Sequence, residues 1–309
     1  MSVFTPVSID QLTPWLAAYG VGSIQGLRGI SGGTVNTNYW VDTEAGAWIL
    51  TLIEDRDAAA VAPVMQLMQA LSERGLPVPQ VRANARGERV GWLLDKPATL
   101  VQALPGEHPL PSPQVAHQVG AFLGRLHQQK LSVPTLPLNF DWSWQQAEAA
   151  RWHALLGGED AILIDRALAT VAPVWTIPLP TAWLHADLFL DNVLVHAGQL
   201  TAVIDWYFAS CGPAVWDLAI TLNAWCGAQA VSASPVAEAL WVGYCTERTP
   251  TEAERAALQA MRCSAALRFW LSRLGAQERA QASTSGHDIM VKSPDEYRLL
   301  LIELLSANA

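Results

Sequence analysis

The sequence predicts an α+β fold, with a small antiparallel β-rich lobe in residues 1–103 and a larger, mainly helical lobe in residues 104–309. Three observations lead to this prediction. The first hundred residues contain short runs of β-branched and aromatic residues, separated by turn-forming stretches. A segment rich in proline and glycine, LPGEHPLPSP (Leu104 to Pro113), then interrupts the chain. Beyond this segment the pattern becomes mostly helical.

Five strands and one helix are expected in the smaller lobe. The turns SGG and TEAG separate three strand-like runs, and two more runs follow an NARG turn. The helix lies between these two groups, because Gly75 closes it and the following LPVPQ cannot continue a helix. The predicted strands are Ser23–Ile30, Thr34–Asp42, Ala47–Ile53, Glu88–Leu94 and Ala98–Ala103, and the predicted helix is Ala58–Arg74.

The larger lobe is expected to open with a helix that Ser112 caps and that has Pro113 at its first position. Its apolar residues from Val115 to Leu126 fall on one face at helical spacing. One β-like island, Trp183 to Trp206, interrupts the helical pattern. The further predicted helices are Trp142–Leu156, Asp160–Val171, Pro213–Trp225, Val236–Thr246, Thr251–Gln281 and Pro294–Ser306.

The composition limits the classes of protein to which the chain can belong. Of the 309 residues, 51% are apolar and 15% are charged, which allows a sizeable core. The net charge of −9, without a basic run, argues against a nucleic-acid partner and against an anionic membrane surface. The uncharged stretch Leu218 to Ala237 is too polar to span a membrane. Four cysteines without metal-ligand spacing, and no apparent signal peptide, predict a reduced cytoplasmic protein.

The island carries the chemistry. His185, Asp187 and Asn192 have the spacing of a kinase catalytic loop, and a hairpin that turns at Ala197–Gly198 then delivers Asp205. A carboxylate at Asp187 can receive and orient the acceptor hydroxyl, while Asn192 and Asp205 offer hard oxygen ligands for Mg²⁺. Either motif alone is common in proteins of other kinds. Their combination between apolar strands predicts transfer of a phosphoryl group from ATP.

Two other polar residues of the loop are expected to have supporting roles. His185 is interpreted as a scaffold residue that hydrogen-bonds the loop, not as the catalytic base. Asp191 is interpreted as a solvated or capping acid rather than a metal ligand.

The loop resembles that of the aminoglycoside phosphotransferase and choline kinase superfamily, and within it the chain resembles the bacterial homoserine kinases. The likeness runs nearly end to end, outside Leu131–Pro180, and includes MSVFTPVS, GISGGTVNTNYWV, WILTLIE, GLPVP, LHADLFLDNVL, DLAITLNAWC, RFWLSRL and SPDEYRL. The resemblance implies a protein-kinase-like two-lobe fold and the cofactors ATP and Mg²⁺. It further implies transfer of the γ-phosphate to the side-chain hydroxyl of L-homoserine, which gives O-phospho-L-homoserine for threonine biosynthesis.

The resemblance also implies where the nucleotide binds. In GISGGTVN, the residues Ser31, Gly32 and Gly33 would cover the phosphates, since glycines allow the backbone to approach closely. In LVQAL, the backbone groups of Gln102 and Leu104 would hydrogen-bond adenine. An ordinary hairpin turn and an ordinary strand end are the structural alternatives for these two segments.

One position departs from the pattern of protein kinases. The third strand places Thr51 where kinases have a lysine for the phosphates, and Gln66 stands where its glutamate partner is found. The homoserine kinases also lack this lysine, so its absence does not imply inactivity. Thr51 is kept as a nucleotide-binding residue. What neutralises the phosphates in place of the lysine is left open, and the candidates are Arg28, Arg56 and a second Mg²⁺.

The remaining assignments concern the loop support and the acceptor. The resemblance implies that Asp217 braces the catalytic loop. Homoserine requires partners for its ammonium and carboxylate groups, and Arg268 could bind the carboxylate bidentately. For Arg268 and Arg273 the alternative is a solvated helix face. The residues predicted to bind the acceptor are Trp206, Tyr207, Asn223 and Arg268.

Two alternative functions remain open. The same fold could act on choline or another small hydroxylated amine, because Trp206, Tyr207 and Trp225 could surround a quaternary ammonium group. The chain could also be a nucleotide-binding pseudokinase, which the threonine at position 51 would suggest. The sequence leaves the oligomeric state open.

Overall fold

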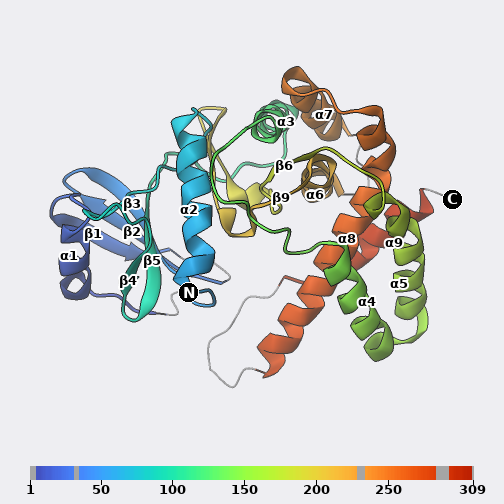
Figure 1. Cartoon of the computed structure of the whole chain (residues 1–309), viewed down its shortest axis with the longest axis horizontal. Coiled ribbons are helices and arrows are strands. Elements are labelled where there is room, and N and C mark those ends of the chain that lie inside the picture. Colours follow the sequence, from blue (N-terminus) through green and yellow to red (C-terminus); the bar gives the residue numbers. More distant parts are fainter. Residues whose placement is uncertain (1–4, 31–34, 228–233, 283–291, 308–309) are drawn as a thin grey trace.

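A computed structural model of the chain describes residues 5–30, 35–227, 234–282 and 292–307, so the predicted phosphate-covering residues Ser31, Gly32 and Gly33 lie outside the described residues. Figure 1 shows a β-sheet at one end of the molecule and a larger helical body at the other, with α2 (Ala58–Glu73) standing between them. This arrangement confirms the predicted α+β fold with a small antiparallel sheet and a helical lobe.

The five-stranded sheet has the order β1-β2-β3-β5-β4, and every neighbouring pair is antiparallel. In β2 the residues alternate between buried and half-buried, so that one face packs on the lobe's own apolar core. All five predicted strands are confirmed, with ends shifted by up to a few residues. Their bounds are β1 Ile24–Gly29, β2 Thr37–Thr43, β3 Gly46–Leu52, β4 Gly91–Leu93 and β5 Lys96–Gln102.

A helix that was not predicted, α1 (Ile9–Ala17), packs its buried Leu12 and Leu16 into the core of the sheet. Its start is a capping box, in which the Ser8 hydroxyl accepts from the Gln11 backbone and the Gln11 side chain accepts from the Ser8 backbone. The Ser8-x-x-Gln11 spacing is the sequence signal that would have identified this helix.

Helix α2 is confirmed as predicted, and Asp57 caps it by accepting from the Ala60 backbone at 2.7 Å. Its buried residues belong to the same apolar core as the helices of the larger lobe, whereas the sheet and α1 form a separate core. The lobe boundary predicted after residue 103 stays a prediction. By their packing, the buried residues between 53 and 81 belong to the core of the larger lobe.

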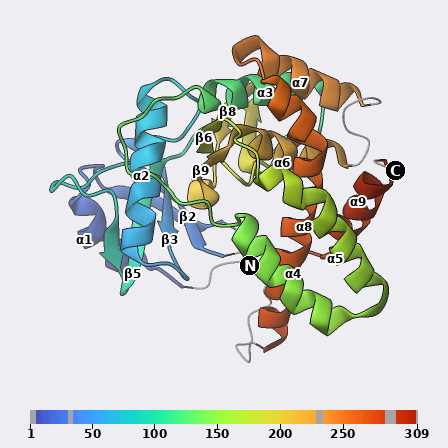
Figure 2. The same cartoon turned by 45° about the vertical axis from the view of Figure 1, so that its right-hand side comes forward.

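The larger lobe confirms each predicted helix. Helices α3 and α7 lie side by side in Figures 1 and 2, and at their contact a Cβ on Gly120 would come within 2.0 Å of the Leu240 carbonyl oxygen. Only glycine allows the two backbones to approach this closely. The helices are α3 Pro113–His127, α4 Trp142–Leu156, α5 Gly158–Val171, α6 Ala214–Cys226, α7 Pro235–Glu247, α8 Glu252–Ala282 and α9 Asp295–Ser306. In the described ranges, no helix is both long and apolar enough to cross a membrane.

Two small sheets form in and around the predicted β-like island, and the last strand of the second sheet lies beyond the predicted end at Trp206. Strands β7 (Val193–His196) and β8 (Gln199–Val203) form the predicted hairpin, whose turn residues Ala197 and Gly198 both have positive φ. Strand β6 (Thr181–Leu184) pairs with β9 (Ser210–Pro213). This second pair fixes the two ends of the island to each other, so that the loop after β6 and the segment after β8 are held together.

Candidate active site

The loop that follows β6 is held by the carboxylate of Asp217 at the start of α6. Asp217 is fully buried and accepts from the backbone N–H groups of His185 and Ala186, both at 2.8 Å. Ala186 has a φ of 61°, a conformation that costs a residue with a Cβ about 1–2 kcal/mol. The two hydrogen bonds to Asp217 therefore stabilise a loop conformation that the local sequence does not favour.

The carboxylate of Asp217 also contacts His127 on α3, with 3.3 Å between Nε2 and Oδ2. Burial acts to raise the pKa of Asp217, but the hydrogen bonds from His127 and from the His185 backbone outweigh it, so the pKa is held below its ordinary value. Beyond His127 the Tyr244 hydroxyl lies 2.8 Å from its Nδ1 and accepts from Arg248, also at 2.8 Å. The brace of the loop thus extends from α6 through α3 to α7.

The imidazole of His185 lies inside the protein. It is fully buried, its Nε2 lies 3.0 Å from the Ile204 carbonyl, and its ring packs edge-on against Trp206. Burial lowers the pKa of His185, which favours the neutral ring that donates to Ile204. This geometry supports a scaffold role, since the contact joins the catalytic loop to the segment before Asp205.

The side chain of Asp187 is 18% exposed, so its carboxylate can reach a bound ligand. The amide of Asn192 donates to the Asp187 carbonyl at 2.7 Å and to its carboxylate at 3.2 Å. On the other side, Arg268 Nη1 approaches Asp187 Oδ1 to 3.7 Å. Burial raises the pKa of Asp187, while the positive charge of Arg268 opposes that rise. The carboxylate is thus held in place by Asn192 and Arg268, and its raised pKa makes it a better proton acceptor. Both properties suit a group that accepts the proton of a hydroxyl.

Asn192 and Asp205 offer oxygen donors that suit Mg²⁺. Because the Asn192 amide nitrogen donates to Asp187, the remaining side-chain atom of Asn192 is its carbonyl oxygen, which accepts from no donor in the described residues. The Asn192 backbone carbonyl accepts from Ile204 at 3.0 Å, which brings Asn192 beside the segment that ends in Asp205. Among the described residues, no group of three or more His, Cys, Asp or Glu side chains is arranged so that it could hold a metal ion without other ligands. One carboxylate and one amide are enough for Mg²⁺, which keeps waters and phosphate oxygens as its other ligands.

The electrostatics of Asp205 support the same conclusion. Its pKa is raised to about 7, first because many protein atoms surround the carboxylate and then because Asp187 and Asp191 repel its charge. The residue still reaches solvent, and it has a left-handed backbone with φ 61° and ψ 64°. A divalent cation bound at Asp205 would relieve this repulsion, so the residues present fit the ion.

Arg268, on α8, is the predicted acceptor residue that the structure brings to Asp187. Its side chain is 2% exposed, so it does not lie on a solvated helix face. The guanidinium stacks on the rings of Phe140 at 4.0 Å and Phe269 at 3.7 Å, and its Nε is buried without a hydrogen-bond partner in the described residues. Burial lowers the pKa of Arg268 to about 10, which leaves it charged at neutral pH. A buried cation with an unused donor fits an incoming carboxylate.

The other predicted acceptor residues lie in different surroundings. Trp206 is 1% exposed and its indole N–H donates to the Val203 carbonyl. Asn223 is buried between α6 and α8, where it donates to the Arg262 carbonyl and accepts from the Arg262 guanidinium. The polar atoms of Trp206 and Asn223 are therefore engaged inside the protein, so neither residue offers a free polar group to the acceptor.

Tyr207 faces the sheet of the smaller lobe rather than α8. Its hydroxyl lies 3.5 Å from Thr99 Oγ1, and burial raises the pKa of the phenol to about 12. The predicted nucleotide-binding residue Thr51 neighbours Thr99 in the sheet and donates its hydroxyl to Asn38 at 2.7 Å. Tyr207 thus connects the segment after Asp205 to strand β5, at the position that pairs with Thr51 of β3.

The predicted adenine contacts lie at the junction of the two lobes. The Gln102 N–H donates to the Gln80 carbonyl at 2.9 Å and is therefore not free for adenine. The backbone carbonyl of Gln102 is the group that could still face adenine. The N–H of Leu104 donates to no acceptor among the described residues. Both groups remain candidates for the nucleotide.

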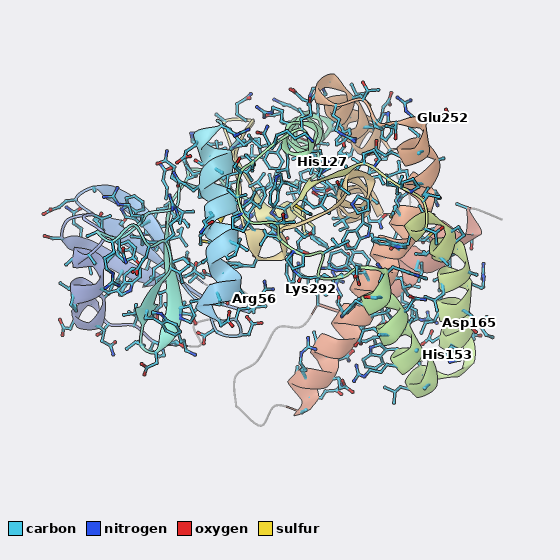
Figure 3. All side chains as sticks on the ribbon, in the orientation of Figure 1. Arg56, His127, His153, Asp165, Glu252 and Lys292 are labelled. Atoms are coloured by element: carbon cyan, nitrogen blue, oxygen red, sulfur yellow. The ribbon has the colours of Figure 1, made fainter. Side chains whose placement is uncertain are left out.

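Two cations lie close to the acids of the site: Lys292, which sequence reasoning did not identify, and Arg56, which it named as one candidate for the missing charge. Lys292, which precedes α9, pairs with Asp191 at 2.7 Å and lies over the Phe189 ring at 5.1 Å. Arg56, which precedes α2, donates to the Tyr207 carbonyl. Figure 3 labels Arg56 near the end of α2 and Lys292 at the edge of the larger lobe that faces it. No local motif marks either residue, because both reach the site through tertiary contacts.

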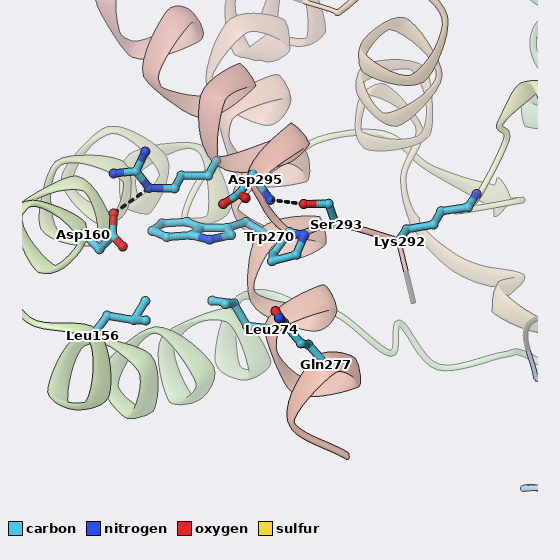
Figure 4. A pocket seen from close by; sticks show the side chains of 10 residues that line it. Leu156, Asp160, Trp270, Leu274, Gln277, Lys292, Ser293 and Asp295 are labelled. Atoms are coloured by element: carbon cyan, nitrogen blue, oxygen red, sulfur yellow. Dashed lines mark hydrogen bonds and ion pairs between the residues drawn. The ribbon is translucent and has the colours of Figure 1, made fainter. Parts of the chain in front are cut away.

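A pocket of about 660 Å³ lies elsewhere, between α4, α5, α8 and the start of α9 (Figure 4). Trp270 and Leu274 line it, and an ion pair between Asp160 and Arg298 crosses one side at 2.6 Å. The side chain of Lys292 extends away from these residues. None of the predicted site residues lines this pocket.

Sequence comparison identifies close relatives of the chain. A model of the phosphotransferase enzyme family matches residues 26–258. The homoserine kinase of Methylobacillus glycogenes is 36% identical over 311 residues, which cover 100% of this chain and 97% of that protein. The homoserine kinase of Pseudomonas aeruginosa strain LESB58 is 36% identical over 308 residues, covering 98% of this chain and 96% of that protein.

Solved structures share the fold at low sequence identity. An amicoumacin kinase in complex with AMP-PNP and Ca²⁺ superposes with a TM-score of 0.70 at 17% identity, covering 97% of this chain and 94% of that one. A spectinomycin phosphotransferase in complex with ADP also has a TM-score of 0.70, at 14% identity, covering 98% of this chain and 99% of that one. These likenesses establish the two-lobe fold, and the relatives at 36% identity are the ones that bear on the substrate.

Proposed function

Because the chain belongs to the phosphotransferase enzyme family and groups within it with the homoserine kinases, we propose that it transfers the γ-phosphate of ATP to the side-chain hydroxyl of L-homoserine. The product is O-phospho-L-homoserine, on the route to threonine. The observation that carries this proposal is the similarity to homoserine kinases over the whole chain. The site supports it, since Asp187, Asn192 and Asp205 come from one loop and one hairpin that are held together.

Asp187 has the central role in the proposed reaction. Its carboxylate accepts the proton of the acceptor hydroxyl, whose oxygen forms a bond to the γ-phosphorus while the bond to the β-phosphate oxygen breaks and ADP leaves. Asn192 and Arg268 approach the carboxylate from two sides and fix its direction. Orientation of this kind contributes to the rate because the reacting groups are held in line before the reaction.

Asn192 Oδ1 and the Asp205 carboxylate would hold Mg²⁺, which supplies positive charge to the β- and γ-phosphates when it is bound. The left-handed backbone at Asp205 directs this residue away from the β8 strand that precedes it. Gln102 and Leu104 would contact adenine, and Ser31, Gly32, Gly33 and Thr51 are retained as proposed nucleotide-binding residues.

Arg268 is proposed to bind the carboxylate of homoserine. The guanidinium is held between two aromatic rings next to Asp187, so a substrate carboxylate bound there would leave the substrate's far end close to the catalytic group. Tyr207, two residues after Asp205, remains a proposed contact of the acceptor. The engaged indole of Trp206 weakens the alternative of an aromatic cage for choline.

An acceptor panel tests the proposed function. Release of ADP is measured with L-homoserine, choline and a further small amino alcohol at equal concentrations in the presence of Mg·ATP. We expect turnover of L-homoserine far above that of choline, because choline has no carboxylate to accept a hydrogen bond from the unused, buried N–H of Arg268. Comparable turnover of choline would refute homoserine as the substrate. Nucleotide binding without turnover of any acceptor would instead favour the pseudokinase.

A further inference from the structure

The charge that kinases place on the third strand is missing here. Strand β3 contains no lysine or arginine, and Thr51 at the expected position is 6% exposed with its hydroxyl donated to Asn38. The phosphates of a nucleotide bound at Asp205 would nevertheless carry several negative charges into a region that already holds Asp187 and Asp191. A cation from another element must therefore lie near the metal-binding segment.

Most cations of the smaller lobe are committed elsewhere. Arg28 is 64% exposed, pairs with Asp42 at 3.7 Å and stacks on Trp40 at 4.6 Å. Lys96 pairs with Glu54 at 2.8 Å. The guanidinium groups of three others bond to groups remote from Asp205, namely Arg74 to Gln129, Arg82 to the Tyr19 carbonyl and Arg86 to Glu88.

Arg56 differs from these residues in its position. It lies in the short segment between β3 and α2, and its Nη1 donates to the carbonyl of Tyr207, two residues after Asp205. The guanidinium lies 5.2 Å from the ring centroid of Phe208 and acts through its charge on the carboxylate of Asp205. Its side chain remains 28% exposed, and within the described residues the only ion pair that it forms is with Asp55, at 4.0 Å. Several of its N–H donors are thus free for a ligand.

We propose that Arg56 binds the phosphates of ATP and supplies the positive charge that kinases obtain from the third-strand lysine. A guanidinium presents paired donors to phosphate oxygens, which a threonine hydroxyl cannot replace. The contact with Tyr207 would hold Arg56 in place before the nucleotide binds. This proposal rests on the proposed function for the identity of the nucleotide and adds a residue that binds its phosphates.

Binding of Mg·ATP and of adenosine to Arg56→Gln tests the assignment by titration calorimetry. We expect the affinity for Mg·ATP to fall at least about tenfold, because charged phosphate contacts are lost, while the affinity for adenosine stays within about twofold. Arg28→Gln is the matched control, since it removes an equal charge from the same lobe at an exposed site. It is expected to leave both affinities unchanged.

Arg56→Lys provides a second variant that keeps the charge but loses the forked geometry. It is expected to bind Mg·ATP about three- to tenfold more weakly than wild type, with adenosine unchanged. If Arg56 only ties the two lobes together through Tyr207, both ligands would weaken equally in both variants. Equal losses of this kind, or unchanged Mg·ATP binding, would overturn the proposal.

The wild-type measurements separate this proposal from the proposed function. Binding of Mg·ATP without turnover of L-homoserine would refute the acceptor and leave the role of Arg56 open to the same titration. Failure of the wild type to bind Mg·ATP at all would overturn both.

Discussion

Replacing Asp217 by alanine should destabilise the whole protein as well as the catalytic loop. The carboxylate is fully buried and accepts from two backbone N–H groups, those of His185 and Ala186, in addition to its contact with His127. Alanine would remove the acceptor that these three groups share. The buried N–H groups would then have no acceptor, and water could not reach them to take its place.

The magnitude follows from the number of groups left unsatisfied. A buried donor that loses its acceptor costs about 1–3 kcal/mol, so the two N–H groups together predict a loss of ~2–6 kcal/mol in the free energy of unfolding. The left-handed conformation of Ala186 would also lose the hydrogen bond that holds it, so the loop should relax and turnover should fall with the stability.

Urea denaturation of the wild type and the Asp217→Ala variant measures this loss. Asp165→Ala is a matched control, because Asp165 also pairs with a histidine, His153, at 3.3 Å, but the two side chains are 65% and 44% exposed. Figure 3 shows the exposed pair at the far end of the larger lobe and His127 in its interior. The control should change the free energy of unfolding by less than ~1 kcal/mol. A loss below 1 kcal/mol for Asp217→Ala would refute the reasoning from unsatisfied donors.

The same carboxylate gives the stability a defined dependence on pH. Since the pKa of Asp217 is held below its ordinary value of about 4, its stabilising contribution is present above that value and is lost as the pH falls through the lower folded-state pKa. The difference in unfolding free energy between wild type and Asp217→Asn should therefore be constant near neutral pH and shrink below about pH 4. A difference that grows on acidification would contradict this sign.

Three substitutions test the proposed reaction. Asp187→Asn should lower kcat by about 10²–10⁴-fold with little loss of nucleotide affinity, and near-normal turnover of the folded variant would remove Asp187 from the reaction. Asp205→Ala should weaken Mg·ATP binding and activity together, so unchanged affinity in calorimetry would refute its role as a ligand. Arg268→Met should raise the KM for L-homoserine at least about tenfold and lower kcat, since Arg268 also approaches Asp187, with little change in the KM for ATP. An unchanged homoserine KM would move the carboxylate site to another residue.

The sequence alone determined the features that depend on local patterns. The spacing from His185 to Asn192, the hairpin that ends at Asp205 and the bounds of the helices were all readable, because periodicity, caps and turn residues act over a few positions. Helix α1 was missed although its capping box was present in the sequence.

Tertiary structure decided which side chains meet. Arg268 was one of several possible acceptor residues until the packing of α8 placed it beside Asp187, and the same packing enclosed Asn223. Arg56 and Arg28 were equivalent as candidates in the sequence, yet only Arg56 contacts the segment after Asp205 in the described structure. Such contacts join residues far apart in the chain, and they depend on how whole elements bury their apolar faces, which no local pattern specifies.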